Sequence, residues 1–243
     1  MSYNFKDLVV LDMANNHQGD LSHGLKIIRE FSTLVEKFDL NLCIKFQFRQ
    51  LDTFIHEEFR NKKDIPHIPR FIETELSNEE YGELHREAKK LGFITACTPF
   101  DEASVSLIEE MGFDLIKIAS CSANDTPLLE RIKKSSMPIL ASTGGLSLME
   151  IDYLYEMYKS NLAGFAMHHC VSIYPTPPDC YNLNQIKLLI NRYSDTEVGW
   201  STHEDPNDFN AVMMAFAAGA TMLERHVGLA TDKYKLNNYS STP

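Results

Sequence analysis

Eight short apolar runs alternate with segments of helical spacing along the chain, and this alternation constrains the fold more than any other feature. The runs are rich in β-branched and aromatic residues, and each run except the last precedes a segment with apolar residues every three or four positions. We expect strands at residues 8–14, 42–48, 93–98, 114–120, 138–143, 164–170, 197–201 and 221–227.

The segments between these strands predict helices near residues 21–38, 77–92, 102–111, 127–134, 147–158, 183–192 and 206–218. The second of them begins with Ser77 and has Glu80 three residues later, which is the pattern of a capping box. Apolar strands that alternate with amphipathic helices indicate a parallel sheet covered on both faces. Eight such units predict an α/β fold of the (β/α)8 TIM barrel type, with residues 1–243 as a single domain.

An open doubly wound sheet is the alternative fold, and the lack of a GxGxxG motif after any strand disfavours it. Two features interrupt the regular pattern. Residues 49–76 form a long insertion after the second strand, which we interpret as a lid that orders when ligand binds. After the last strand the sequence GLATDKYKLNNYSSTP contains no helical pattern, so the barrel is expected to lack its eighth helix.

The charge balance limits the partners. The chain has 23 basic and 34 acidic residues and a formal net charge of -11, which argues against nucleic acid or an anionic membrane as the main partner. A phosphorylated substrate stays possible, because a few lysines in a cleft can outweigh a distant acidic surface. The apolar stretch 211–223 is shorter than a membrane span and is expected to be a helix packed on the barrel.

The cysteine pattern and the N-terminal sequence bear on the compartment. The five cysteines include no CxxC pair and lie mostly in apolar runs, so we expect them to be reduced and buried in a cytoplasmic protein. The first residues, MSYNFKDL, have no apolar signal core.

Polar side chains gather where the predicted strands end, which is where (β/α)8 barrels carry their chemistry. The stretch EVGWSTHED shows this, because an apolar strand turns abruptly polar at Ser201. The strand ends together supply Asp12, Asn15, Asn16, His17, Lys45, Gln47, Thr98, Lys117, Ser120, Ser122, Asn124, Ser142, Thr143, Gly144, His169, Ser172, Tyr174, Ser201, His203, Glu224 and His226.

These residue types suit an anionic substrate and a metal ion. Lysines, hydroxyls and a glycine turn can bind a phosphate and a carboxylate, and Lys45 and Lys117 are notable because buried lysines are almost always paired. His203 and His226, on neighbouring strands, can hold one metal ion and leave positions open for substrate. A lone strand-end histidine is more often structural, and the two lack HxxH spacing. We interpret Glu204 and Asp205 as caps of the helix that begins near residue 206.

Eight motifs carry a resemblance that covers essentially the whole chain. NNHQGD, IKFQF, CTPFD, IKIASCSANDTPLL, PILASTGG, HCVSIYPTP, VGWSTHE and GATMLERHV resemble, in order and spacing, the motifs of the sialic acid (N-acetylneuraminate) synthase family. The resemblance implies a barrel enzyme that condenses phosphoenolpyruvate with an amino-sugar aldehyde, similar to N-acetylmannosamine, and releases phosphate. It also implies a homodimer and a divalent metal, Mn²⁺ or Mg²⁺, held by His203 and His226.

The same resemblance assigns roles residue by residue. The implied phosphoenolpyruvate contacts are Lys45, Thr98, Lys117, Ser120, Ser142 and Ser201. Gln47 and Tyr174 resemble sugar-side positions, and Asp12 is the candidate base that activates water. We therefore expect Asp12, Lys45 and Lys117 to be catalytic.

Several positions depart from the family pattern. Asp12 replaces a glutamate, Ser122 a glutamate, Ser172 an asparagine and Thr202 an aspartate, while Asn237 takes the place of an aspartate near the sugar. The resemblance also implies a C-terminal antifreeze-like domain, which supplies an arginine to the partner subunit's site, and the 243 residues do not include it. We expect either that they are a fragment of a longer protein or that the partner contacts come from elsewhere. Together the substitutions suggest a different sugar or a divergent subfamily.

Two other functions stay open at this point. A Schiff-base aldolase would use Lys45 or Lys117 as its nucleophile. A non-catalytic barrel, retained as a binding module of a larger protein, would explain the substituted base and sugar-side residues.

Overall fold

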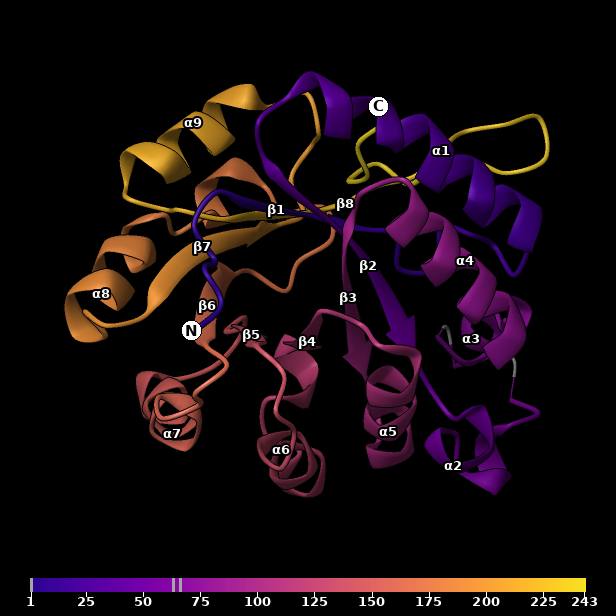
Figure 1. The fold of residues 1–243 in the computed structure, drawn as a ribbon, viewed down its shortest axis with the longest axis horizontal. Coiled ribbons are helices and arrows are strands. Elements are labelled where there is room, and N and C mark those ends of the chain that lie inside the picture. The colour runs from indigo at the N-terminus through magenta and orange to yellow at the C-terminus, as the bar shows by residue number, and fades with distance from the viewer. Residues whose placement is uncertain (1, 63, 66) are drawn as a thin grey trace.

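Eight parallel strands pair in chain order, and the last pairs with the first, so the sheet closes into a barrel (Figure 1). The computed structural model describes residues 2–62, 64–65 and 67–243. The strands are β1 (Leu8–Asp12), β2 (Asn41–Phe48), β3 (Ile94–Pro99), β4 (Leu115–Ile118), β5 (Ile139–Ser142), β6 (Phe165–Cys170), β7 (Glu197–Thr202) and β8 (Leu223–His226). The predicted (β/α)8 barrel is confirmed.

Seven helices surround the barrel in the described part of the chain, one after each of the first seven strands. They are α1 (Leu21–Lys37), α4 (Asn78–Lys90), α5 (Glu102–Met111), α6 (Thr126–Lys133), α7 (Leu148–Tyr158), α8 (Asn184–Arg192) and α9 (Phe209–Ala217). The predicted capping box of Ser77 and Glu80 begins α4, and Ser147 with Glu150 forms a second one at α7. None of the described helices has the length and apolar character that crossing a membrane requires.

The start of α9 differs from the prediction. Asp208 caps this helix by accepting a hydrogen bond from the backbone N–H of Ala211. Asp205 instead accepts from Asn207 within the preceding turn, and Glu204 is fully buried and paired with Arg225. The interpretation of Glu204 and Asp205 as caps is therefore wrong, because the turn after Asp205 moves the first helical residue beyond their reach.

Only one face of α9 packs on the barrel. Ala211 and Ala215 are buried, whereas Phe209, Met213 and Met214 are exposed. The stretch 211–223 is thus a packed helix followed by β8, as expected, but the helix keeps an apolar outer face.

The insertion after β2 folds into short helices. These are α2 (Leu51–Phe54), the 3₁₀ turn η1 (Glu57–Phe59) and α3 (His67–Glu73), and Figure 1 shows α2 and α3 beyond the arrowheads of β2 and β3. The guanidinium of Arg49 lies 4.5 Å from the ring centre of Phe71 and 4.2 Å from that of Phe100. The insertion is therefore attached to the mouth of the barrel, and its behaviour as a lid stays a prediction.

The segment after β8 contains no helix, as predicted, and runs beside α1 (Figure 1). Val227 forms a bridge with Ser241, and the side chain of Asn16 donates to the carbonyl of Val227 and the hydroxyl of Ser240. A Cβ at Gly228 would come within 2.6 Å of Leu236 Cδ1 and 3.1 Å of Asn16 Cβ, so the tail returns close to the loop after β1 here. The tail is thereby fixed next to the loop after β1.

The five cysteines are free thiols, as predicted. Cys43, Cys97 and Cys170 are buried, Cys180 is half-buried and Cys121 is exposed. The expected burial is wrong for Cys121, because this residue lies in the 3₁₀ turn η2 (Ser120–Ser122) at the rim beyond β4.

Candidate active site

Side-chain alternation along the strands separates an apolar plug from a polar mouth inside the barrel. Leu8, Val10, Cys43, Ala96, Leu115, Leu140, Ala166 and Met222 belong to the cluster that fills the lower interior. Two residues after Cys43 and Leu115, on the same inward face, come Lys45 and Lys117. The residues between them, such as Ile44 and Ile116, belong to the other cluster, which packs under the helices. Strand geometry therefore directs both lysines into the mouth.

The mouth holds a cavity of about 460 Å³. It is lined by Asp12, Lys45, Gln47, Arg49, His67, Phe71, Thr98, Phe100, Lys117, Ala119, Ser120, Cys121, Ser142, Cys170, Ser172, Tyr174, Ser201, His203, Glu224 and His226. All the residues to which the sequence analysis assigned a site role line it except Ser122 and Asn237. Segments far apart in the chain thus meet in one cavity.

The two lysines are paired with two carboxylates. Lys45 Nζ lies 2.8 Å from Asp12 Oδ2 and donates a hydrogen bond to Thr98 Oγ1. Lys117 Nζ lies 2.6 Å from Glu224 Oε2, and the other oxygen of Glu224 lies 3.6 Å from Lys45 Nζ. Each lysine is therefore already paired with a carboxylate in the absence of a ligand.

Burial and pairing act in opposite directions on the pKa values of this group. Burial alone would lower the pKa of Lys45, but the carboxylates of Asp12 and Glu224 outweigh it and raise that pKa. Burial would raise the pKa of Glu224, but Lys117 and Lys45 hold it well below its usual value. For Lys117 burial prevails over Glu224, and its pKa is lowered. Glu224 is therefore an anion that both lysines share.

His203 and His226 lie side by side at the ends of β7 and β8, with ring centres 5.3 Å apart. His203 Nδ1 donates to the carbonyl of Val171, which leaves Nε2 as the nitrogen with a free lone pair. Burial lowers the pKa of His203 to about 4 and also lowers that of His226, so both rings are neutral near pH 7. Neutral imidazole, oriented by a carbonyl, is the form that binds a metal ion.

Asp12 is next to this pair, with its Oδ2 3.7 Å from His226 Nε2. No three His, Cys, Asp or Glu residues of the described chain are arranged to enclose an ion by themselves. A metal bound by the two imidazoles alone, with its remaining positions left to water or substrate, stays a prediction.

Aromatic rings form one wall of the mouth. The ring centre of Tyr174 lies 4.0 Å from that of His203, and Tyr239 lies 5.5 Å from Tyr174 and 5.3 Å from His226. Tyr174 therefore lies beside the two histidines, and its sugar-side role stays a prediction. Tyr239 received no role from the sequence, because only the return of the tail brings it there.

Two predicted site residues lie outside this cavity. Ser122 is buried in the turn after β4, where its N–H donates to the carbonyl of Ala119. Asn237 donates to Asn16 Oδ1 and accepts from the backbone N–H of Tyr239, and it lines a neighbouring cavity.

Of the two histidines in β6, His169 was predicted at the mouth of the barrel, and this prediction is wrong. His169 points out of the barrel and shares a hydrogen bond with the carbonyl of Tyr181, whereas His168 points inward with its Nδ1 3.6 Å from Glu224. Every residue of β6 is buried, so the sequence shows no alternation that would set its phase.

Glu224 and Arg49 are the functional candidates to which the sequence analysis gave no role. Arg49 follows Lys45 and Gln47 at two-residue steps, so β2 alternation is the signal that would have found it. Its guanidinium donates to Gln47 and has no carboxylate in ion-pair range within the described residues. Glu224 precedes His226 by the same step on β8.

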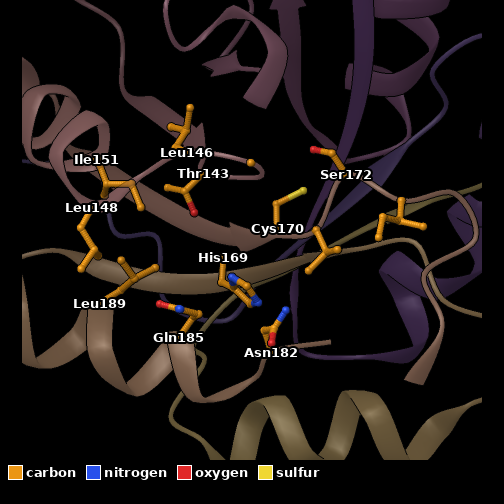
Figure 2. Close-up of a pocket in the computed structure, with 13 residues that line it drawn as sticks. Thr143, Leu146, Leu148, Ile151, His169, Cys170, Ser172, Asn182, Gln185 and Leu189 are labelled. Atoms are coloured by element: carbon orange, nitrogen blue, oxygen red, sulfur yellow. The ribbon is translucent and has the colours of Figure 1, made fainter. Parts of the chain in front are cut away.

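A second cavity of about 400 Å³ lies beside the mouth, between α7 and α8. Figure 2 shows Cys170 and Ser172, which also line the central cavity, at one end and Leu148, Ile151 and Leu189 at the other. No lysine, arginine or carboxylate lines it among the residues described. The charged chemistry therefore belongs to the central cavity.

The fold and site define a (β/α)8 barrel with a cavity at the carboxyl ends of its strands, lined by two carboxylate-paired lysines and two histidines. The NeuB family model matches residues 41–241, and the chain belongs to the NeuB family. The predicted resemblance is thus confirmed at the level of the family.

Relatives and solved structures agree with this assignment. The chain is 32% identical to an uncharacterized protein of Methanocaldococcus jannaschii and 29% identical to human N-acetylneuraminate-9-phosphate synthase, over 91% of this chain and 62% of each relative. It is 27% identical to N,N'-diacetyllegionaminic acid synthase of Campylobacter jejuni, over 92% of this chain and 68% of the relative. It thus spans about three fifths of the length of the first two.

Two solved structures superpose closely. The spore coat polysaccharide biosynthesis protein E from Chromobacterium violaceum is 46% identical, with a TM-score of 0.95 over 98% of this chain and 70% of that chain. The N-acetylneuraminic acid synthetase from Leptospira borgpetersenii is 26% identical, with a TM-score of 0.84 over 98% of this chain and 79% of that chain.

Proposed function

We propose that this protein is a metal-dependent synthase, which condenses phosphoenolpyruvate with an amino-sugar aldehyde to form a nonulosonic acid and releases phosphate. The observation that carries the proposal is the meeting of two buried, carboxylate-paired lysines with two neutral histidines in one cavity. The names of the related synthases support the reaction class.

Phosphoenolpyruvate is assigned to the lysine side of the cavity. Lys45, Thr98 and Lys117 supply positive charge and a hydroxyl, and the buried hydroxyl of Ser142 has no hydrogen-bond partner within the described chain. Ser120 accepts from the N–H of Gly144, which orients its hydroxyl at the same rim. Ser201, whose hydroxyl donates to Glu224 at 3.4 Å, completes this side. Charge-assisted bonds of this kind suit a phosphate and a carboxylate.

The aldehyde is assigned to the histidine side. His203 and His226 would hold Mn²⁺ or Mg²⁺, which when bound would polarise the aldehyde oxygen as a Lewis acid. Gln47, Ser172 and Tyr174 line the same cavity and would orient the sugar. Asp12, between Lys45 and His226, would accept the proton of the attacking water. The shorter side chain of Asp12, relative to the family's glutamate, still reaches both neighbours.

The homodimer and the cytoplasmic location stay predictions, which sedimentation of the purified chain and cell fractionation would test. The two alternative functions differ from the proposal in measurable ways. A Schiff-base aldolase would be trapped by borohydride on Lys45 or Lys117, and a non-catalytic module would not bind phosphoenolpyruvate.

Calorimetric titration of phosphoenolpyruvate into the chain, with and without Mn²⁺, tests the proposal. Lys117→Ala is expected to weaken binding about tenfold or more, because it removes one charged hydrogen-bond donor. His226→Ala is expected to remove the part of the binding that depends on Mn²⁺. Lys187→Ala, at an exposed lysine of α8, is the matched control and should bind normally. Absence of binding in the wild type under both conditions would overturn the proposal.

A further inference from the structure

A basic cavity of about 530 Å³ lies next to the mouth of the barrel, between the loop after β1, the helix α3 and the tail. It is lined by Asn16, Gln18, Arg70, Lys233, Tyr234, Lys235, Leu236, Asn237 and Tyr239. Three of these described lining residues are cations and none is a carboxylate, although the chain as a whole has a net charge of -11. Such a local reversal of charge is typical of a site for an anion.

The cations differ in how far they are neutralised. Lys233 Nζ lies 3.0 Å from Asp20 Oδ2, so its charge is partly balanced. Arg70 is half-buried and donates to Gln18 Oε1 at 2.8 Å and to the carbonyl of Asn15 at 3.0 Å. Both acceptors are neutral, so they orient the guanidinium without compensating its charge. Lys235 has no ion pair within the described residues, which leaves two cations for a ligand.

Tyr239 connects this basic cavity to the candidate active site. Its side chain lines the basic cavity, and its ring centre lies 5.3 Å from that of His226, which lines the central cavity. The rings of Tyr239 and His226 therefore lie between the two cavities at this point. Asn237, which the resemblance placed near the sugar, faces the same basic cavity and holds the backbone N–H of Tyr239.

We propose that the acceptor is a sugar phosphate, and that its phosphate group binds in this basic cavity against Arg70 and Lys235. The aldehyde end of the same molecule lies at His203 and His226, with the carbon chain passing Tyr239. This inference rests on the proposed condensation and adds the class of its second substrate. The names of the related synthases do not decide whether the acceptor carries a phosphate. One relative is named for a 9-phosphate product and another for N,N'-diacetyllegionaminic acid.

Three probes test the inference by calorimetry: N-acetylmannosamine 6-phosphate, N-acetylmannosamine and inorganic phosphate, each titrated into the 243-residue chain with Mn²⁺ present. The phosphorylated sugar is expected to bind at least about tenfold more tightly than the neutral sugar, because it gains charge-assisted hydrogen bonds. Arg70→Gln and Lys235→Gln should each reduce this preference. Neither substitution should change the affinity for the neutral sugar, and the control Lys187→Gln should change neither.

Arg70 donates hydrogen bonds to Gln18 and Asn15, so Arg70→Gln could disturb the loop after β1. Lys235→Gln avoids this problem, because the Lys235 side chain makes no hydrogen bond within the described chain. Equal affinity for the two sugars would overturn the inference, as would a preference that survives in both variants. A third outcome is that inorganic phosphate binds as tightly as the sugar phosphate and that its binding depends on Arg70. That result would overturn the assignment of a sugar phosphate as acceptor and would indicate a site for free anions.

A parallel titration with phosphoenolpyruvate separates the two proposals. Binding that depends on Lys117, together with equal affinity for the two sugars, would overturn the inference and keep the proposed condensation. A preference for the sugar phosphate that depends on Arg70, without any binding of phosphoenolpyruvate, would keep the anion site and overturn the condensation.

Discussion

Glu224 Oε2 lies 2.6 Å from Lys117 Nζ, and Glu224 Oε1 lies 3.6 Å from Lys45 Nζ, so one buried carboxylate is shared by both lysines of the site. Without this carboxylate, Asp12 alone would face two almost fully buried lysines. Glu224 therefore sets the spacing of the lysines and stabilises the fold at the same time.

Glu224→Gln is expected to lower the free energy of unfolding by about 3 kcal/mol or more, because it leaves a buried cation uncompensated. Urea unfolding at pH 7 measures this. Glu156→Gln is the control, because Glu156 forms an exposed pair with Lys159, and it should cost less than about 1 kcal/mol. Equal stability of the Glu224→Gln variant and the wild type would contradict the shared-charge arrangement.

His17 is expected to make the protein less stable in mild acid. Burial, with Arg70 and Arg49 nearby, lowers the pKa of His17 from 6.5 to about 3. Between these values the unfolded chain binds a proton that the folded chain does not, so stability falls as the pH drops below 6.5. From pH 7.5 to pH 5 this residue should contribute a loss of about 2 kcal/mol, measured by urea unfolding at the two values.

His17→Asn should remove that part of the pH dependence. The control is His56→Asn, because the exposed His56 also accepts a backbone N–H two residues on, as His17 does from Gly19. An identical loss of stability in His17→Asn and the wild type would refute the assignment to His17.

Gly144→Ala is expected to weaken phosphoenolpyruvate binding about tenfold while the protein stays folded. A Cβ at this position would come within 2.6 Å of Ser172 Oγ and 2.9 Å of Ser120 Oγ, and must displace hydroxyls that line the central cavity. The tenfold figure corresponds to the loss of one hydrogen bond to a charged group. Calorimetry measures the affinity, and circular dichroism checks the fold.

Gly82→Ala is the matched control, because the added methyl group meets only the flexible end of Arg86. This variant should bind normally. Unchanged affinity in Gly144→Ala would show that the hydroxyl of Ser120 does not contact phosphoenolpyruvate.

The insertion of residues 49–76 is expected to become resistant to trypsin when phosphoenolpyruvate and Mn²⁺ bind together. Arg60 and Lys62 lie in its outer part, between α2 and α3, where a closing lid would be protected. Mass spectrometry of timed digests measures cleavage there. Cleavage at a rate that ligand does not change would contradict a lid.

Alternation along individual strands explains which site residues could be predicted. Lys45 and Lys117 interrupt apolar runs, so their sequence neighbourhood already marked them as unusual. The strand β6 offers no such contrast, because all its residues are buried, and the sequence could not decide between His168 and His169. The difference matters, since only His168 faces Glu224.

The amino-acid sequence by itself determined the barrel, the order of its strands and the residue types at their ends, because periodicity and local propensity act over neighbouring residues. The tertiary structure decided which of those residues share one cavity. Glu224 reaches Lys117 across 107 positions of the chain, and Asn16 fixes the tail through Ser240 across 224 positions. Such contacts depend on the closure of the sheet and the return of the tail, and no local pattern in the sequence encodes them.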